Sequence, residues 1–252
     1  MQQLFPGDSP AGYKRNALMG IVIVVALAAL LIAGVLFFQP RAAVRLLARA
    51  NPEVLFLVDT DQRAVALTID DAPSPEVTPG ILERLARHGA HATFFIIGEQ
   101  AQAHPELVRQ ILADGHEVGN HMMKDRPSIL LSREAFADCL ARTEALLGDG
   151  ALPRWFRPAS GWFNGAMLKA VARHGDRLCL GSIFPHDNKL RRPDWIARFV
   201  MNRIFPGAII VLHDGGERRR YTLEVLDDVL PRLEAAGYRV LTVSELVATA
   251  SE

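Results

Sequence analysis

The hydrophobic residues of this chain follow one pattern before residue 54 and a different pattern after it. Residues 17–38 form one apolar stretch without a charged side chain, and a stretch of this length can cross the hydrocarbon of a bilayer as a helix. From residue 54 onward, short runs of β-branched and aliphatic residues alternate with segments whose apolar residues recur at helical spacing. This alternation predicts β/α units that are built on a parallel sheet.

The predicted strands are continuously apolar, which is typical of strands covered on both faces. One predicted helix has Pro79 at its first position and ends at Gly89, the next ends at Gly115, and a third begins near Ser132; these are typical helix start and stop signals. About seven such units favour a closed or nearly closed barrel, with an open doubly wound sheet as the alternative. The expected strands are 54–60, 64–70, 92–98, 116–122, 154–160, 177–183, 207–214 and 238–246, and the expected helices are 78–89, 103–115, 131–148, 164–175, 193–203 and 222–237.

The chain accordingly divides into a tail (1–16), a transmembrane helix (17–38), a linker (39–53) and a catalytic domain (54–252). A cleaved signal peptide is the alternative for the apolar stretch, but the apolar core of such peptides usually spans only about 7–15 residues. Basic residues flank the stretch on both sides, so charge does not decide its orientation. The linker can form a helix along the membrane surface or a simple connection.

Composition excludes several classes of function. Acidic and basic residues are equal in number, which gives a formal net charge of zero and no general field to attract nucleic acid. We therefore expect no nucleic-acid partner. Cys139 and Cys179 are the only cysteines and lie far apart, so neither a disulfide framework nor a thiolate zinc cluster is indicated.

Polar residues gather where the predicted strands end. Asp70 and Asp71 follow an apolar run and precede a proline-rich turn. Adjacent strand residues point to opposite faces, so the turn must rotate both acids into one site; a solvated turn without chemistry is the alternative. The arginine-rich stretch 216–221 is typical of a solvated loop. Other strand ends carry His121, Asp125, Arg157, Asp187, His213 and Asp214, the last as a turn residue.

His121 and Asp125 lie four positions apart, a spacing at which a turn or short helix can direct both side chains at one metal. With Asp71 they supply one imidazole and two carboxylates. This set suits zinc, cobalt, manganese or iron and leaves positions open for water and substrate. A structural histidine is the alternative for His121. His186, beside Asp187, is a further imidazole within the same series of strand ends.

Four motifs in order resemble the polysaccharide deacetylase family, the NodB-homology group of carbohydrate esterases, across residues 64–246. They are TIDDAPS, ATFFIIGEQAQAHPELVRQILADGHEVGNH, RWFRPASGW and PGAIIVLHD. The resemblance implies an α/β fold, a distorted (β/α) barrel with about seven parallel strands. It also implies metal-dependent hydrolysis of N-acetyl groups of amino-sugar polymers such as chitin, peptidoglycan or an exopolysaccharide. With the apolar helix, we expect a single-pass, membrane-anchored enzyme of carbohydrate metabolism at the cell wall, with its catalytic domain outside the cytoplasm.

The resemblance also implies roles for individual residues. Asp70 is the expected general base, Arg157 its orienting partner and His213 the general acid. Asp71 and His121 are the expected ligands of a divalent metal, zinc first and cobalt, manganese or iron as alternatives, with Asp125 at the position of the family's second histidine. Substrate contacts are expected from Ser160, Trp162, Asp187 and Leu212, with Asp194 as the alternative to Asp187.

This chain departs from the family's motifs at several positions. Met122 and Asp125 replace a hydroxyl residue and a histidine, and Ser160 replaces a tyrosine. A carboxylate can serve as a metal ligand in place of an imidazole, and the backbone N–H of Ser160 can serve an oxyanion hole. Two alternatives to the deacetylase therefore stay open: a hydrolase of another non-peptide C–N bond on the same barrel, and a catalytically silent glycan-binding domain.

Overall fold

The computed structural model describes residues 10–148 and 155–250, with side chains from residue 18 onward. The chain forms two compact units, Met1–Ala43 and Val44–Glu252. In the first unit, helix α1 spans Pro10–Phe38, and its stretch Leu18–Phe38 is long and apolar enough to cross a membrane. Residues 1–9 of the predicted tail lie outside the described residues.

The second unit alternates strands and helices largely in the predicted order, but residues 243–246, expected in the last strand, belong to a helix, and a short helix at 98–103 was not predicted. The predicted linker contains α2 (Arg41–Ala50), whose Val44 is buried. The strands are β1 (Val54–Leu55), β2 (Ala64–Ala72), β3 (Thr93–Ile96), β4 (Glu117–Asn120), β5 (Trp155–Phe156), β6 (Arg177–Cys179), β7 (Ile209–His213) and β8 (Arg239–Leu241). The helices are α3 (Thr78–Arg87), α4 (Gly98–Ala103), α5 (Pro105–Ala113), α6 (Arg133–Leu147), α7 (Gly165–Arg173), α8 (Pro193–Met201), α9 (Tyr221–Ala235) and α10 (Val243–Val247), with 3-10 turns at η1 (Ser128–Leu130) and η2 (Glu217–Arg219).

The strands form one sheet in the order β1-β6-β5-β4-β3-β2-β7, with β8 also paired to β2. All of these strand pairs are parallel. Isolated bridges join Leu57 to Ala208 and Ile183 to Ile210, so residues following β1 and β6 meet β7 from the far side of the sheet. The sheet thus curves almost to closure, and the predicted distorted barrel is confirmed.

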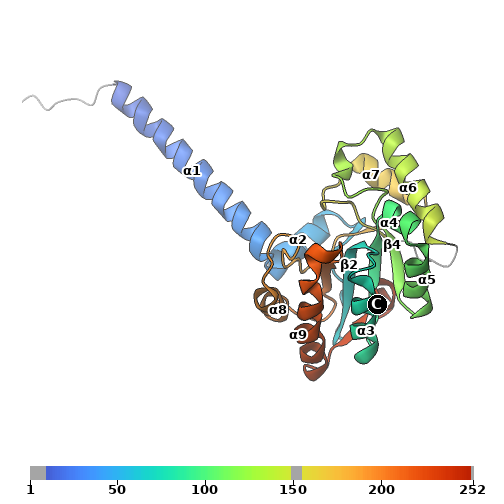
Figure 1. Ribbon diagram of the computed structural model, residues 1–252. Helices are drawn as coiled ribbons and strands as arrows, with labels where there is room; N and C mark the ends of the chain where they lie inside the picture. The colour runs from blue at the N-terminus through green and yellow to red at the C-terminus, as the bar shows by residue number, and fades with distance from the viewer. Residues whose placement is uncertain (1–9, 149–154, 251–252) are drawn as a thin grey trace, which may run out of the picture. The chain divides into compact units, whose positions relative to one another are not determined.

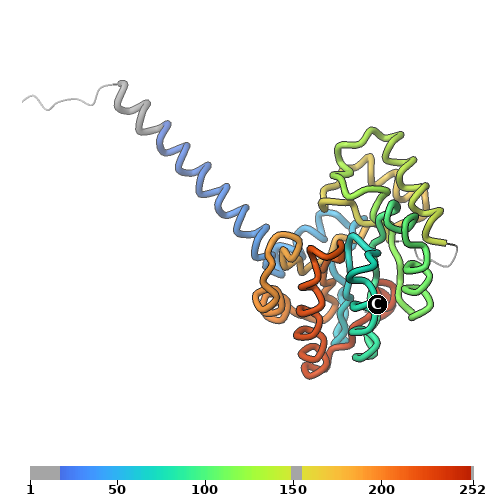
Figure 2. The backbone as a smooth tube through the Cα atoms, viewed as in Figure 1, coloured from blue at the N-terminus to red at the C-terminus, as the bar shows by residue number. Residues whose placement is uncertain are grey.

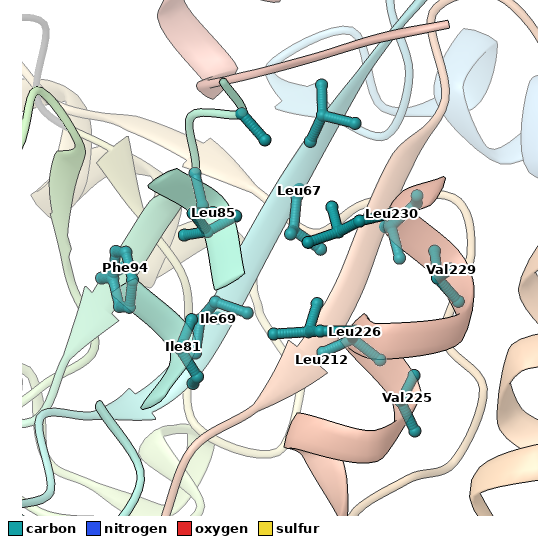
Figure 3. Packing of buried hydrophobic residues seen from close by; sticks show 14 of the residues in the cluster. Leu67, Ile69, Ile81, Leu85, Phe94, Leu212, Val225, Leu226, Val229 and Leu230 are labelled. Carbon is teal, nitrogen blue, oxygen red and sulfur yellow. The ribbon is translucent and has the colours of Figure 1, made fainter. Parts of the chain in front are cut away.

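The main hydrophobic core lies between the sheet and the helices outside it. Figure 3 shows Leu67 and Ile69 of β2 packed among Ile81 of α3 and Leu226 and Leu230 of α9. Helices α3 and α9 lie side by side next to β2 (Figures 1 and 2), and the Nε of Arg84 donates to the carbonyl of Leu223 at 3.0 Å. Each fully buried aliphatic side chain contributes about 1.5–3 kcal/mol by leaving water.

The two faces of β2 have different neighbours. Leu67 and Ile69 belong to the core under the helices, whereas Ala66 belongs to the cluster with Phe95 and Trp155 inside the barrel. Because side chains alternate along a strand, Thr68 and Asp70 also face the barrel interior. The hydrophobic alternation of β2 therefore directs Asp70 into the barrel at its carboxyl end.

Candidate active site

A bulge in β2 brings two adjacent acids to the same site. The pairing of β2 with β3 runs regularly to Ile69 and then shifts before Ala72, and Asp71 has a left-handed φ of 63°. Regular alternation would send Asp70 and Asp71 to opposite faces, but a bulge rotates the chain locally. As a result, the Nε2 of His121 lies 3.4 Å from Asp71 Oδ1 and 4.0 Å from Asp70 Oδ2. The expected rotation occurs, within the strand rather than in the turn after it.

Asp70 is held by a buried arginine from β5's carboxyl end. Nη1 of Arg157 donates to Asp70 Oδ1 at 2.5 Å and to Thr68 Oγ1 at 2.7 Å, and its Nε donates to the carbonyl of Cys179 at 2.9 Å. The guanidinium also lies over the ring of Phe95, 4.0 Å from its centroid. A charged pair with this many partners has one orientation, so Asp70 presents its other oxygen in a fixed direction.

His121 connects the two acids to the neighbouring strand ends. Its Nδ1 donates to the carbonyl of Arg157 at 2.7 Å, so Nε2 faces the carboxylates. Burial alone would lower the pKa of His121, but the charges of Asp70 and Asp71 raise it. Burial would likewise raise the pKa of Asp71, but the hydrogen bond and charge of His121, with the charges of His213 and Arg219, hold it well below its usual range. The two carboxylates thus favour the protonated form of His121, and His121 in turn favours the ionised form of Asp71.

His213 at the end of β7 is oriented by Asp187. Its Nδ1 and its backbone N–H donate to the two carboxylate oxygens of Asp187, each at 2.8 Å. Burial alone would lower the pKa of His213, but the charge and hydrogen bond of Asp187 raise it, with help from Asp70 and Asp71. Because Nδ1 is engaged, Nε2 is the nitrogen with which His213 can exchange a proton. Asp187, expected as a substrate contact, is completely buried and acts on His213.

Other expected site residues lie elsewhere. Asp125 is exposed, and no three His, Cys, Asp or Glu residues within 18–148 and 155–250 are grouped closely enough to hold a metal ion. Leu212 alternates with His213 along β7, so its side chain lies in the core near Leu226 (Figure 3). The ring of His186 packs against Phe184 and Phe199. Ser160 and Trp162 are exposed on the loop after β5.

Two residues expected in a solvated loop and a turn are parts of the site. Arg219, on η2, donates through Nη1 to Asp71 Oδ2 and, at 2.7 Å, to the carbonyl of Asp214. Asp214 is fully buried and accepts from the hydroxyls of Ser74 and Thr78. Burial raises the pKa of Asp214. Local patterns did not place Arg219 in the site or indicate the burial of Asp214, because their partners lie in β2 and in the segment that follows it, far away in the sequence.

Strained backbone concentrates at this edge of the barrel. Asp71, Met122, Ser160 and His186 have left-handed φ values of 57–71°, and each belongs to or follows the carboxyl end of a strand. A non-glycine residue in this region costs about 1–3 kcal/mol. Such strain persists where the surrounding contacts impose it, and it clusters at functional sites. The backbone therefore marks the same edge as the charged side chains.

Sequence comparisons show which family the chain belongs to. The chain matches the family model of polysaccharide deacetylases over residues 57–178. It is 35% identical over 202 residues to a peptidoglycan-N-acetylglucosamine deacetylase of Bacillus cereus, covering 77% of this chain and 92% of the relative. It is also 35% identical over 201 residues to a chitooligosaccharide deacetylase of a Bradyrhizobium species, covering 73% and 90%.

Solved structures share the fold. The Bc1960 peptidoglycan N-acetylglucosamine deacetylase superposes with a TM-score of 0.74 at 30% identity, covering 79% of this chain and 95% of that one. BA3943 of Bacillus anthracis, a pseudoenzyme of family CE4, gives 0.71 at 28% identity, covering 79% and 70%. A family 4 acetyl xylan esterase of Clostridium thermocellum with a bound cobalt ion gives 0.68 at 28% identity, covering 73% and 90%.

Proposed function

Because this chain belongs to the polysaccharide deacetylase family, we propose that it hydrolyses the N-acetyl groups of amino-sugar polymers of the peptidoglycan or chitin type. The observation that carries the proposal is the convergence of Asp70, Asp71, His121 and His213 at one edge of the barrel. The similarity to deacetylases of peptidoglycan and chitooligosaccharides supports this substrate class.

The proposed reaction begins with water that is activated by Asp70. Arg157 keeps this carboxylate in one orientation, and the carboxylate removes a proton as the water oxygen bonds to the acetyl carbon. His213 then donates a proton from Nε2 to the amide nitrogen, and the C–N bond breaks. The products are acetate and a free amino sugar. Asp187 favours the protonated form of His213 for this step, because its charge and hydrogen bond raise the pKa of the imidazole.

Charge on the carbonyl oxygen needs stabilisation in the tetrahedral intermediate. The imidazole of His121 lies beside Asp70 and Asp71, whose charges raise its pKa and favour its positively charged form. The backbone N–H of Ser160 is the proposed additional donor. Fixed donors directed at a developing oxyanion typically contribute about 10²–10³ in rate each. The exposed Trp162, on the same loop as Ser160, is the proposed contact for a sugar ring.

A divalent metal, with zinc as first expectation, does not fit the donors that the structure supplies. Asp71 and His121 face each other, but Asp125 is exposed and Asp71 Oδ2 already accepts from Arg219. The cobalt-bound esterase of Clostridium thermocellum shows that metal occurs in a structural neighbour. The steps above use only side chains and backbone groups of this chain.

We also propose that the apolar helix anchors the protein in a bilayer. The 21 residues Leu18–Phe38 have a mean hydropathy of 3.2 over their most apolar window and are long enough to span the hydrocarbon. A single-pass anchor with the catalytic domain outside the cytoplasm would place that domain beside the cell-wall polymer. Recovery of the uncleaved chain in the membrane fraction, resistant to alkaline carbonate, would support an anchor, whereas a shortened chain in the soluble fraction would indicate a signal peptide.

A second candidate function is glycan binding without turnover. The exposed Asp125 and the pair between Arg219 and Asp71 favour it, as does the similarity to the pseudoenzyme BA3943. Acetate release from chitin oligomers, peptidoglycan and an N-acetylated exopolysaccharide separates the candidates. Release from any of these supports the deacetylase, binding without release supports the silent domain, and release of a different product from another amide would indicate another C–N hydrolase.

A further inference from the structure

The side chain of Arg219 reaches into the site from η2 and binds Asp71. Its Nη1 donates to Asp71 Oδ2, while Asp71 Oδ1 faces Nε2 of His121 at 3.4 Å. Both oxygens of this carboxylate therefore have a partner within the protein. The side chain of Arg219 is 20% exposed and that of Asp71 is 12% exposed, so the pair is largely shielded from water. Ion pairs in such surroundings are screened much less than exposed ones.

The loop after β7 is shaped around this guanidinium. Nη1 also donates to the carbonyl of Asp214 at 2.7 Å, and the carboxylate of Asp214 is fixed by Ser74 and Thr78. The next residue, Gly215, has a φ of 127°, and a Cβ at that position would lie 2.9 Å from Nη1 of Arg219. The absence of a side chain at Gly215 thus leaves the space that the guanidinium occupies.

The charges of the two acids are already compensated. Asp70 pairs with Arg157 at 2.5 Å, and Asp71 pairs with Arg219. Each carboxylate has one guanidinium, and His121 lies between them. A divalent cation at Asp71 would add two positive charges beside Arg219 without a further acid to balance them. Because repulsion between like charges is strong at partly buried positions, the ion and the guanidinium compete for the same carboxylate.

We propose that Arg219 is the resident cation of this site, and that it excludes a tightly bound divalent metal by occupying Asp71. This inference rests on the proposed function only for the location of the site. Its test measures metal binding directly, so it can fail or succeed independently of acetate release.

The test is a titration of the full chain, in detergent, with Zn²⁺ and Co²⁺. Calorimetry measures the affinity for each metal, and elemental analysis after dialysis measures the metal that the protein retains. Arg219→Met removes the charge and keeps most of the apolar stem, and Arg218→Met makes the same change at an exposed position of the same turn. We expect weak binding to the wild type and to Arg218→Met. Arg219→Met should bind Zn²⁺ at least about tenfold more tightly, which corresponds to about 1.4 kcal/mol.

Wild-type protein that retains one equivalent of zinc after dialysis would overturn the proposal, as would equal affinities of the wild type and Arg219→Met. An equal gain in zinc affinity in Arg218→Met would also overturn it, because the gain would then come from the lower net charge and not from the contact with Asp71. Arg219→Gln serves as the second neutral variant where Arg219→Met does not fold, as judged by thermal unfolding. If neither folds, the wild-type titration decides alone: tight binding overturns the proposal and weak binding upholds it.

Discussion

Asp70 and His213 are direct partners in the parallel pairing of β2 with β7, and the backbone N–H of Asp214 donates to the carbonyl of Asp70 at 2.8 Å. The proposed base and the proposed acid are therefore fixed by one ladder of the sheet. Neighbouring strands lie about 4.8 Å apart, so a substrate amide can reach both groups. Their spacing depends on strand pairing rather than on flexible loops.

Asp187 sets the protonation of His213, which predicts a shifted pH profile for Asp187→Asn. The charge of Asp187 raises the pKa of His213, so wild-type activity should fall only as pH rises through this raised value. Without the charge, the alkaline limb of kcat/KM should move to lower pH, and the maximal rate should fall about tenfold or more. The pH profile of acetate release measures this. An unshifted alkaline limb would show that another group is the acid.

Trp162 is 63% exposed on the loop after β5, which predicts a role in binding rather than in folding. Trp162→Ala should raise KM for an acetylated oligosaccharide several-fold with kcat nearly unchanged, because a stacking contact acts on bound substrate and transition state alike. The melting temperature should stay within about 1–2 °C of wild type, since substitutions at exposed positions cost about 0.5 kcal/mol or less. An unchanged KM would exclude this contact.

Because His116 is buried, we expect the protein to lose stability in mild acid. Burial, together with the charge of His91, lowers the pKa of His116 to about 4, while an unfolded histidine titrates near 6.5. Between these values the unfolded chain binds more protons, so the free energy of unfolding should decrease as pH falls from about 6.5 to about 4. His116→Leu should reduce the difference between pH 7 and pH 5 by at most roughly 2 kcal/mol. Urea unfolding of the wild type and of His116→Leu at the two pH values tests this. An equal change in the free energy of unfolding between pH 7 and pH 5 in both proteins would refute it.

Leu226 contributes to stability and not to chemistry. It is fully buried between α9 and β2 in the core of Figure 3, away from the charged edge of the barrel. Leu226→Ala should lower the free energy of unfolding by about 2–5 kcal/mol, through lost burial and the cavity left behind. Acetate release per folded molecule should remain close to wild type at a temperature where the variant is folded. A large loss of turnover in the folded variant would mean that the core controls the site.

Much of the fold could be predicted from local patterns. Continuous apolar runs located the strands, and Ser132 caps α6 as expected, accepting from the N–H of Ala135 at 3.2 Å. Strand-end polarity also identified Asp70, Asp71, His121, Arg157 and His213, which the structure brings to one edge of the barrel. Parallel strands make this possible, since their carboxyl ends meet whatever lies between them in sequence.

The remaining features depend on contacts that no local pattern contains. Arg219 occurs in an arginine-rich stretch typical of a solvated loop, and only the folded chain brings it to Asp71. The family resemblance implied that Asp187 contacts substrate, but the structure buries it as the partner of His213. Asp125 has the spacing of a ligand to His121, yet the loop after β4 leaves it exposed. The positions of these polar residues along the sequence predicted which segments meet. They did not predict which atoms face one another.

The most direct test of the central claim is acetate release by the full chain, compared with Asp70→Asn. The amide keeps the size of the carboxylate but cannot accept the proton of water. We expect acetate from an N-acetylated glycan with the wild type and a rate about 10²–10⁴-fold lower with Asp70→Asn. The variant should keep its glycan affinity and remain folded, with a lower melting temperature because the buried ion pair with Arg157 is lost. Equal rates in the two proteins, or no acetate from any acetylated glycan with the wild type, would contradict it.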